Sequence, residues 1–250
     1  MMYIVISPAK KQNMVNYPAV ATSDYVFRAE AGSLIEILTQ KSIQEIEDLM
    51  QVSTNIADLN CQRYRDFAEA ISHPAAFLFQ GDVYKKLAAA SWGKADCEYA
   101  QLHLGILSGL YGWLRPLDKI VPYRLEMKTK LDNQCGSNLY DFWGEKVSLA
   151  IKKHMQDNGL ELIVNLASNE YFKVLQPELL PFIVNVDFKE QGPKGLRIVA
   201  VNAKRARGLM ANYLICNKIK SIDDIKAFNL EGYCFAKDLS LADRLVFVRQ

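Results

Sequence analysis

The sequence has few of the residues that build metal sites or disulfide frameworks. Its 250 residues include only three histidines, and its five cysteines are odd in number and never form a Cys-x-x-Cys pair. The histidines, at positions 73, 103 and 154, also lack the spacing expected of metal ligands. We therefore expect reduced, structural thiols, no metal site and no cofactor.

The chain also lacks an excess of charge of one sign and any long apolar run. Its formal net charge is only +2, so nucleic-acid binding would require positive charge clustered on one surface. No run approaches the roughly 18 apolar residues of a membrane span. The N-terminal segment MMYIVIS has neither the basic start nor the long apolar core of a secretory signal. These absences predict a cytoplasmic protein with no membrane partner.

The overall composition is that of a globular protein with one core. Half of the residues are hydrophobic and 23% are charged, which are ordinary values. The sequence shows no linker, low-complexity tract or internal repeat, so residues 1–250 are expected to form a single domain.

Polar residues follow three short apolar runs that are predicted to be strands. These runs are Tyr3–Ser7, Ala75–Gln80 and Glu161–Leu166. Lys10 follows the first run and Asp82 the second, and a polar segment follows the third. Ligands collect at the carboxyl ends of strands in open α/β sheets, so the three ends are predicted to share a cleft.

Two residues at these strand ends have alternative roles. Lys10 is either an anion-binding residue or a solvated loop lysine beside Lys11. Asp82 is either the N-cap of a helix that begins near Val83, worth roughly 1 kcal/mol, or an active-site acid, and the two roles are compatible. The spacing Ser7-x-x-Lys10 matches an acyl-enzyme motif, but the partner signatures S-D-N and K-T-G are missing, which disfavours a serine nucleophile.

The stretch Leu107–Met127 mixes charged residues with apolar residues, two glycines and two prolines. This mixture predicts a partly buried loop that holds Arg115 and Arg124 at a fixed site, because the planar guanidinium suits phosphate or carboxylate. The alternative is a structural network in which the two arginines pair with Asp118 and Glu126. The stretch alone does not favour either interpretation.

The densest basic cluster of the chain lies at residues 202–210. Asn202 is predicted to cap a helix, which would place Lys204, Arg205 and Arg207 in its first turn or two. Cations oppose the helix dipole there unless an anion binds. The cluster therefore favours phosphate binding over a solvated face.

Two helices joined by a short turn are predicted between residues 42 and 69. Ser42 and Glu45 form a capping box for the first helix, which runs through Met50. The turn Gln51-Val52-Ser53 precedes the second helix, Thr54–Glu69. This pair is either an ordinary helical hairpin or a helix-hairpin-helix that grips DNA phosphates, although that grip generally uses glycines, which the turn lacks.

Further elements are predicted from apolar patterning. They are helices at Asp96–Leu107, Val147–Met155 and Ser221–Phe228, and strands at Pro181–Phe188, Leu196–Asn202, Gly232–Phe235 and Leu245–Val248. A hairpin turn at residues 192–195 joins the first two of these strands.

Seven stretches of the sequence are similar to those of one bacterial family. They are ISPAK, FQGDVY, LSGLYGWLRPLDKIVPYRLEM, LYDFWG, NLASNEYFK, AKRARGLM and FNLEGYCF. They occur in colinear order over nearly the whole chain, and in them the sequence resembles the peroxide stress protein YaaA family.

The resemblance implies a compact α/β fold, with a mixed sheet flanked by helices and a helix-hairpin-helix-like element at about residues 42–64. It also implies a cytosolic protein of the response to hydrogen peroxide, which binds DNA in a positive cleft and helps to limit iron-driven oxidative damage. The resemblance supplies no iron site, so any effect on iron homeostasis is expected to be indirect.

The leading hypothesis is that the protein binds the phosphate backbone of DNA, duplex or branched and unpaired, by structure rather than by sequence. The basic residues assigned to this role are Lys10, Arg115, Arg124, Lys173, Lys204, Arg205 and Arg207. The aromatic residues that would stack on exposed bases are Tyr84, Tyr111, Trp113 and Tyr123.

The alternative hypothesis is an enzyme that acts on a small phosphorylated or carboxylate substrate. Asp82 or Glu126 would be its acid or base, and the arginines would hold the anionic ligand. A third hypothesis, direct handling of iron or haem, is disfavoured because no cluster of ligands is visible.

Overall fold

A mixed sheet forms the centre of the computed structural model, which describes residues 1–13, 15–175, 177–193 and 195–250. Its parallel strands, in spatial order, are β12 (Arg244–Arg249), β9 (Ile183–Gly192), β8 (Leu162–Asn165), β1 (Met2–Ile6) and β5 (Leu104–Ser108). Three strands pair antiparallel with these: β11 (Tyr233–Phe235) with β12, β6 (Gly112–Leu114) with β5, and β10 (Gly195–Arg197) with β9. The expected α/β class with a mixed sheet flanked by helices is confirmed.

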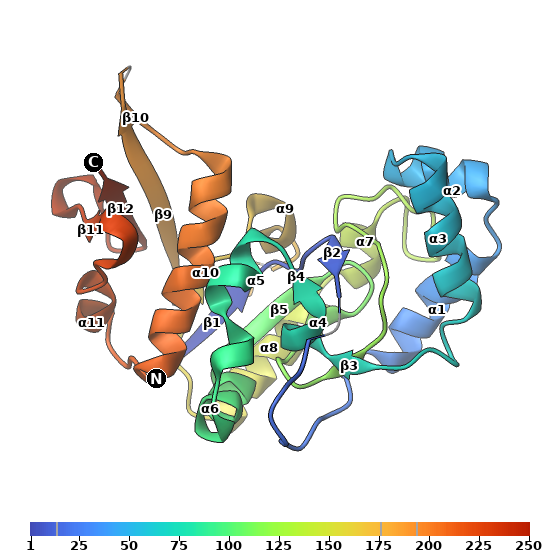
Figure 1. The fold of residues 1–250 in the computed structure, drawn as a ribbon, viewed down its shortest axis with the longest axis horizontal. Helices are drawn as coiled ribbons and strands as arrows, with labels where there is room; N and C mark the ends of the chain where they lie inside the picture. The colour runs from blue at the N-terminus through green and yellow to red at the C-terminus, as the bar shows by residue number, and fades with distance from the viewer. Residues whose placement is uncertain (14, 176, 194) are drawn as a thin grey trace.

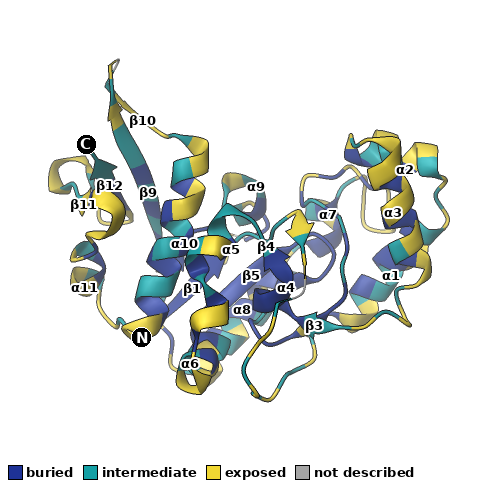
Figure 2. Ribbon diagram, viewed as in Figure 1, coloured by how far each residue is buried: buried dark blue, intermediate teal, exposed yellow. Residues whose placement is uncertain are grey.

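Helices cover the sheet on both faces, which is why its central strands are apolar throughout. The long helix α10 (Ala200–Cys216) packs on α5 (Asp82–Leu87), α6 (Lys94–His103) and β9, and lies in front of the sheet in Figure 1. Helix α8 (Lys146–Asp157) packs on β6. Every residue of β1 and β5 is buried (Figure 2), as expected of parallel strands covered on both faces.

A unit of three helices lies at the end of the molecule opposite the β11–β12 edge (Figure 1). It consists of α1 (Arg28–Thr39), α2 (Ile43–Met50) and α3 (Thr54–Arg65). The predicted capping box of α2 is confirmed, because the Glu45 amide donates to Ser42 Oγ at 3.3 Å and the Ser42 amide donates to Glu45 Oε2 at 2.8 Å. One cluster of buried side chains includes Leu34 of α1 and Phe247 of β12, so the unit shares the main core.

Shorter elements connect these parts. The strand β2 (Lys11–Gln12) pairs with β4 (Phe79–Gln80), and β3 (His73–Pro74) pairs with β7 (Lys119–Ile120). The remaining α-helices are α4 (Ala75–Leu78), α7 (Leu139–Trp143), α9 (Asn169–Phe172) and α11 (Ile222–Lys226). Short 3-10 helices lie at Ala89–Ser91, Pro177–Phe182, Leu230–Gly232 and Lys237–Leu239. None of the helices in the described ranges is long and apolar enough to cross a membrane.

Several predicted elements are wrong in type or in bounds. The expected strand Ala75–Gln80 is helix α4 followed by the two residues of β4, and all of α4 is buried, so its pattern carries no helical periodicity. The expected helix Asp96–Leu107 ends at His103, because the apolar residues that follow form the buried strand β5. Helix α10 begins at Ala200 rather than after Asn202.

The predicted hairpin after residue 181 is present, with β9 and β10 paired antiparallel. Its expected second strand, Leu196–Asn202, is wrong in its bounds, because β10 ends at Arg197 and residues 200–202 belong to α10. Of its expected turn, Gly192 and Gly195 lie opposite each other in this pairing, whereas Lys194 lies outside the described residues.

The contact between α10 and α5 depends on a glycine. A Cβ atom at Gly208 would lie 2.0 Å from the carbonyl oxygen of Val83 and 2.8 Å from its carbonyl carbon. The two backbones therefore touch at this point, which fixes how α10 crosses α5.

Replacing Gly208 by alanine should destabilise the protein by about 3 kcal/mol or more, because the new methyl group meets backbone atoms that cannot move independently. The free energy of unfolding in urea measures this effect. Gly32→Ala is the matched control, since nothing lies within 4 Å of a Cβ atom at this position in α1. It should stabilise the protein by about 0.5–1 kcal/mol through helix propensity. Equal effects of the two substitutions would contradict the close crossing.

Candidate functional site

The loops that follow β1 and β8 are bonded to each other at the carboxyl edge of the sheet. The amide of Ser168 donates to Ser7 Oγ at 2.9 Å, and the two serine hydroxyls lie 3.3 Å apart. From α5, the hydroxyl of Tyr84 donates to the Ser7 carbonyl oxygen at 3.0 Å. Burial raises the pKa of Tyr84, so its phenol remains a neutral donor. Three segments that are distant in sequence therefore meet at one place.

This edge is hollowed into a cleft of about 430 Å³, which we call the strand-end cleft. Its lining includes residues 7–11, 80–84, 166, 168, 170 and 171, so the prediction that the three strand ends share a cleft is confirmed. The segment at residues 80–84 does not follow a strand of the main sheet. It reaches the cleft because β4 pairs with β2, which lies in the loop after β1. The charged lining residues are Lys10, Lys11, Asp82, Glu126, Lys128, Glu170, Lys204 and Arg207.

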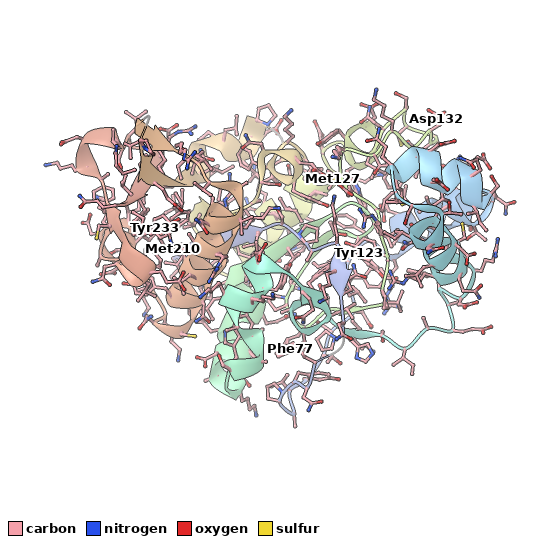
Figure 3. All side chains as sticks on the ribbon, turned by 45° about the horizontal axis from the view of Figure 1, so that its top comes forward. Phe77, Tyr123, Met127, Asp132, Met210 and Tyr233 are labelled. Carbon is pink, nitrogen blue, oxygen red and sulfur yellow. The ribbon has the colours of Figure 1, made fainter. Side chains whose placement is uncertain are left out.

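A second cleft, of about 780 Å³, adjoins the first and is called the α2 groove here. One of its walls is α2 with the residues that flank it. The other is the segment at residues 124–132, in which Met127 and Asp132 are labelled in Figure 3. Its cationic lining residues are Lys10, Lys41, Arg124, Lys128 and Lys130, and its acidic ones are Glu45, Asp48, Glu126 and Asp132.

Burial alternates along this segment, and its charged residues are the more exposed ones. The side chains of Tyr123, Leu125, Met127, Thr129 and Leu131 are buried, and the charged residues between them line the groove. The alternation continues through a turn at residues 127–128, where the Thr129 amide donates to the Glu126 carbonyl oxygen at 3.0 Å. The sequence YRLEMKTKLD shows this period of two, with an apolar or small residue at every second position. The sequence analysis did not use this pattern and therefore did not predict Lys128 and Lys130 as site residues.

Glu126 lies where the two clefts join, and three cations surround its carboxylate. Lys10 Nζ lies 2.9 Å from Oε1, Arg124 Nη2 lies 3.2 Å from Oε1, and Lys128 Nζ lies 3.7 Å from Oε2. A close backbone contact holds this part of the segment, because a Cβ atom at Gly109 would lie 2.3 Å from the carbonyl oxygen of Leu125. Glu126 is thus a fully paired carboxylate, which does not favour a role as acid or base.

Arg207 lines the strand-end cleft from the third turn of α10. Its Nε atom is buried and has no hydrogen-bond partner among the described residues, and burial lowers the pKa of its guanidinium. Asp187 attracts Arg207, but the carboxylate of Asp187 is already paired with Arg244, whose Nη1 lies 2.9 Å from Asp187 Oδ2. A buried unpaired donor costs about 1–3 kcal/mol, so the position of Arg207 is unfavourable until an acceptor reaches it.

The basic cluster of α10 does not lie at the start of the helix, which corrects the prediction. Val199 is the N-cap in place of Asn202, so Lys204 and Arg207 lie in the second and third turns, where backbone amides are already paired. Lys204 also lines the strand-end cleft, whereas Arg205 is exposed and attracted to Glu231 outside it.

Asp82 is not the N-cap of its helix either. Gly81 occupies that position with φ of 124°, and Asp82 is the first residue of α5. The carboxylate of Asp82 lines the strand-end cleft and has no hydrogen bond or ion pair with any side chain or amide that the structure describes. An acceptor without a partner is therefore available to a ligand there.

Ser7 and Lys10 do not form a nucleophile and base pair. Ser7 Oγ is bonded to Ser168, and Lys10 Nζ is paired with Glu126. The structure therefore agrees with the sequence in disfavouring a serine nucleophile.

Three of the predicted anion-binding residues, Arg115, Lys173 and Arg205, lie outside both clefts. Arg115 forms a buried network with Asp118, donating from Nη2 to Oδ1 at 2.8 Å, and also donates to the Asp24 carbonyl oxygen at 3.1 Å. For Arg115 the structural interpretation is therefore correct. Lys173 is exposed at the end of α9 and lines neither cleft.

The four aromatic residues expected to stack on bases are buried, which corrects that prediction. Tyr111, Trp113, Tyr123 and Tyr84 are at most 5% exposed. Trp113 donates to the Tyr3 hydroxyl at 2.7 Å, and the hydroxyls of Tyr123 and Ser108 lie 2.6 Å apart. Stacking requires an exposed ring face, and these rings contribute to the core instead.

The helix pair α2–α3 is present with its three-residue turn, but the first two of its three turn amides are satisfied internally. The amides of Gln51 and Val52 both donate to the carbonyl oxygen of Glu47. Gln51 adopts a φ of 50°, a left-handed conformation that glycine usually supplies in such turns and that strains other residues. Helix α2 also carries three carboxylates, at residues 45, 47 and 48. This turn is therefore poorly suited to grip a phosphate.

Within the described ranges, no three His, Cys, Asp or Glu side chains gather into a set that could hold a metal ion.

Fold and clefts together define a mixed α/β protein with a charged cleft at the carboxyl edge of its sheet and a charged groove that adjoins it. Comparison with known proteins identifies the family. The family model described as Peroxide stress protein YaaA matches residues 2–239, and the chain belongs to this family.

Its similar relatives are full-length matches from diverse bacteria. A UPF0246 protein of Legionella pneumophila (strain Corby) is 44% identical over 255 residues, covering 99% of each chain. A UPF0246 protein of Saccharophagus degradans is also 44% identical and covers 100% of both chains. One from Acaryochloris marina is 42% identical, covering 99% of this chain and 100% of its own.

Replacing Asp118 by asparagine should destabilise the protein by about 2–4 kcal/mol, because Asp118 is fully buried and accepts from Ser23 and from both the amide and the guanidinium of Arg115. Asp24→Asn is the control, since the ion pairs of Asp24 with Arg28 and Lys119 are exposed and should cost less than about 1 kcal/mol. Urea denaturation compares the two variants. A small effect at Asp118 would mean that Arg115 is free for another partner.

Proposed function

We propose that the protein binds the phosphate backbone of DNA in the α2 groove. The observation that supports this most directly is the set of cations on the segment at residues 124–132. Arg124, Lys128 and Lys130 point into the same open groove as Lys10 and Lys41, although the whole chain has a net charge of only +2. Five cations and four carboxylates line the groove, and four of the cations are paired with Glu126 or Glu45. DNA phosphates would replace these carboxylates as the partners of the cations.

The chemistry of the groove favours contacts to phosphates over contacts to bases. Four of its five cations are lysines, which act as flexible point charges rather than as rigid forks. The aromatic candidates for stacking are buried, and two of the three turn amides of the helix pair are occupied. We therefore propose binding with little sequence preference, to duplex or to branched and unpaired DNA.

In the cell, this activity would serve the response to peroxide in the cytoplasm. Membership of the Peroxide stress protein YaaA family supports that context. Protein bound along the DNA would shield it from oxidants that iron generates from hydrogen peroxide, and such shielding requires no iron site in the protein.

A salt series of DNA-binding measurements tests the proposal. The double variant Lys128→Gln/Lys130→Gln should bind DNA at least about tenfold more weakly, and its slope of log K against log salt should be less steep by about two, since each phosphate contact contributes about 0.9. Fluorescence anisotropy with labelled duplex and branched DNA gives both quantities. The same variant should also protect plasmid DNA less well from nicking by Fe²⁺ and hydrogen peroxide.

The control is Lys220→Gln/Lys237→Gln, which removes the same charge from exposed positions outside both clefts. Its affinity and slope should equal those of the parent protein. If both double variants lose affinity equally, net charge rather than the groove attracts DNA; if neither does, the groove is not the site.

Glu126→Gln should bind DNA severalfold more tightly and with a steeper salt slope. The carboxylate of Glu126 competes with phosphate for Lys10, Arg124 and Lys128, and the amide frees these cations. Glu161→Gln, an equal change of charge at an exposed position beside the N-terminus, is the control and should have little effect. Weaker binding by Glu126→Gln alone would show that Glu126 positions the cations instead of competing for them.

A further inference from the structure

The strand-end cleft contains groups that the α2 groove does not use. Asp82, Lys204 and Arg207 line this cleft and not the groove. We propose that the strand-end cleft is a second, separate binding site, whose ligand is a small nucleoside monophosphate. The proposal does not depend on DNA binding, because its three residues lie outside the groove to which DNA binding is assigned.

The cationic side of the cleft requires an anion with several acceptor oxygens. Arg207 offers a planar fork of donors, and its buried Nε has no acceptor among the described residues. Lys204 lies on the same helix, one turn before Arg207, and lines the same cleft. A phosphate group satisfies a guanidinium and an ammonium together, and a guanidinium binds it in a bidentate manner.

Asp82 favours a ligand that also carries hydrogen-bond donors. Its carboxylate only accepts hydrogen bonds when ionised, and no described residue supplies a donor. A ligand that carries hydroxyl groups as well as a phosphate would satisfy Asp82 and Arg207 at once. Inorganic phosphate lacks such a second group, whereas the ribose of a nucleotide has it.

The rest of the lining selects among phosphorylated compounds. Pro8, Ala9 and Val83 are partly exposed and contribute apolar surface, which a sugar phosphate alone would not cover and which suits the face of a base. The volume of about 430 Å³ lies in the range of small-molecule sites. The serines at the strand ends are bonded to each other, so they shape the wall of the site and are not free to react.

Isothermal titration of the full-length protein with the four ribonucleoside 5′-monophosphates tests this site. At least one nucleotide should bind saturably, and its nucleoside and inorganic phosphate should each bind at least tenfold more weakly. Arg207→Gln should weaken nucleotide binding at least tenfold, and Asp82→Asn should weaken it severalfold. Circular dichroism verifies that each variant is folded; Lys204→Gln, at an exposed position, provides a second cation variant that should leave the fold intact.

Lys130→Gln is the matched control, because Lys130 lines only the α2 groove. It should leave nucleotide affinity unchanged while it weakens DNA binding. The proposal is overturned if none of the nucleotides binds, if the nucleoside binds as tightly as its monophosphate, or if Lys204→Gln and Arg207→Gln, both folded, bind like the parent protein. Loss of DNA binding in Lys130→Gln with intact nucleotide binding separates the two sites.

Discussion

The parallel pairing of β1 with β8 on one side and β5 on the other is the constraint on which the rest of the structure depends. In this register Ile4 lies opposite both Leu104 and Val164. Close packing favours this register. The hydroxyl of Tyr3 lies against Gly105, and a Cβ atom at Gly105 would lie only 2.4 Å from that hydroxyl. Parallel strands end at the same edge, and the strand-end cleft opens at this edge.

Much of the fold was predictable where the signal is local. The capping box at Ser42 and the apolar runs of β1 and β8 depend on residues adjacent in sequence, and the structure confirms them. The errors occurred where burial on all sides removes periodicity, as at Ala75–Leu78, or where one apolar run passes from a helix into a strand, as at Leu104. In such runs the tertiary environment decides between helix and strand.

The site was predictable in outline but not in its partners. Polar strand ends indicated a shared cleft, and Lys10, Asp82, Arg124, Lys204 and Arg207 all line one of the two clefts. The sequence could not decide between binding and structural roles for the arginines, because charge alone does not specify a neighbour in space. Folding pairs Arg115 with the buried Asp118, yet leaves the Nε of Arg207 without an acceptor within the described structure. Exposure of the aromatic rings likewise depends on packing that no local pattern reveals.

The position of Glu126 at the junction has a thermodynamic consequence for any pair of ligands in the two clefts. Lys10 and Lys128 line both clefts and also neutralise Glu126. An anion that draws either lysine toward one cleft leaves Glu126 less compensated and removes a cation from the other cleft. A ligand in one cleft therefore weakens the binding of a ligand in the other. This coupling is reciprocal, so each ligand lowers the affinity for the other by the same factor.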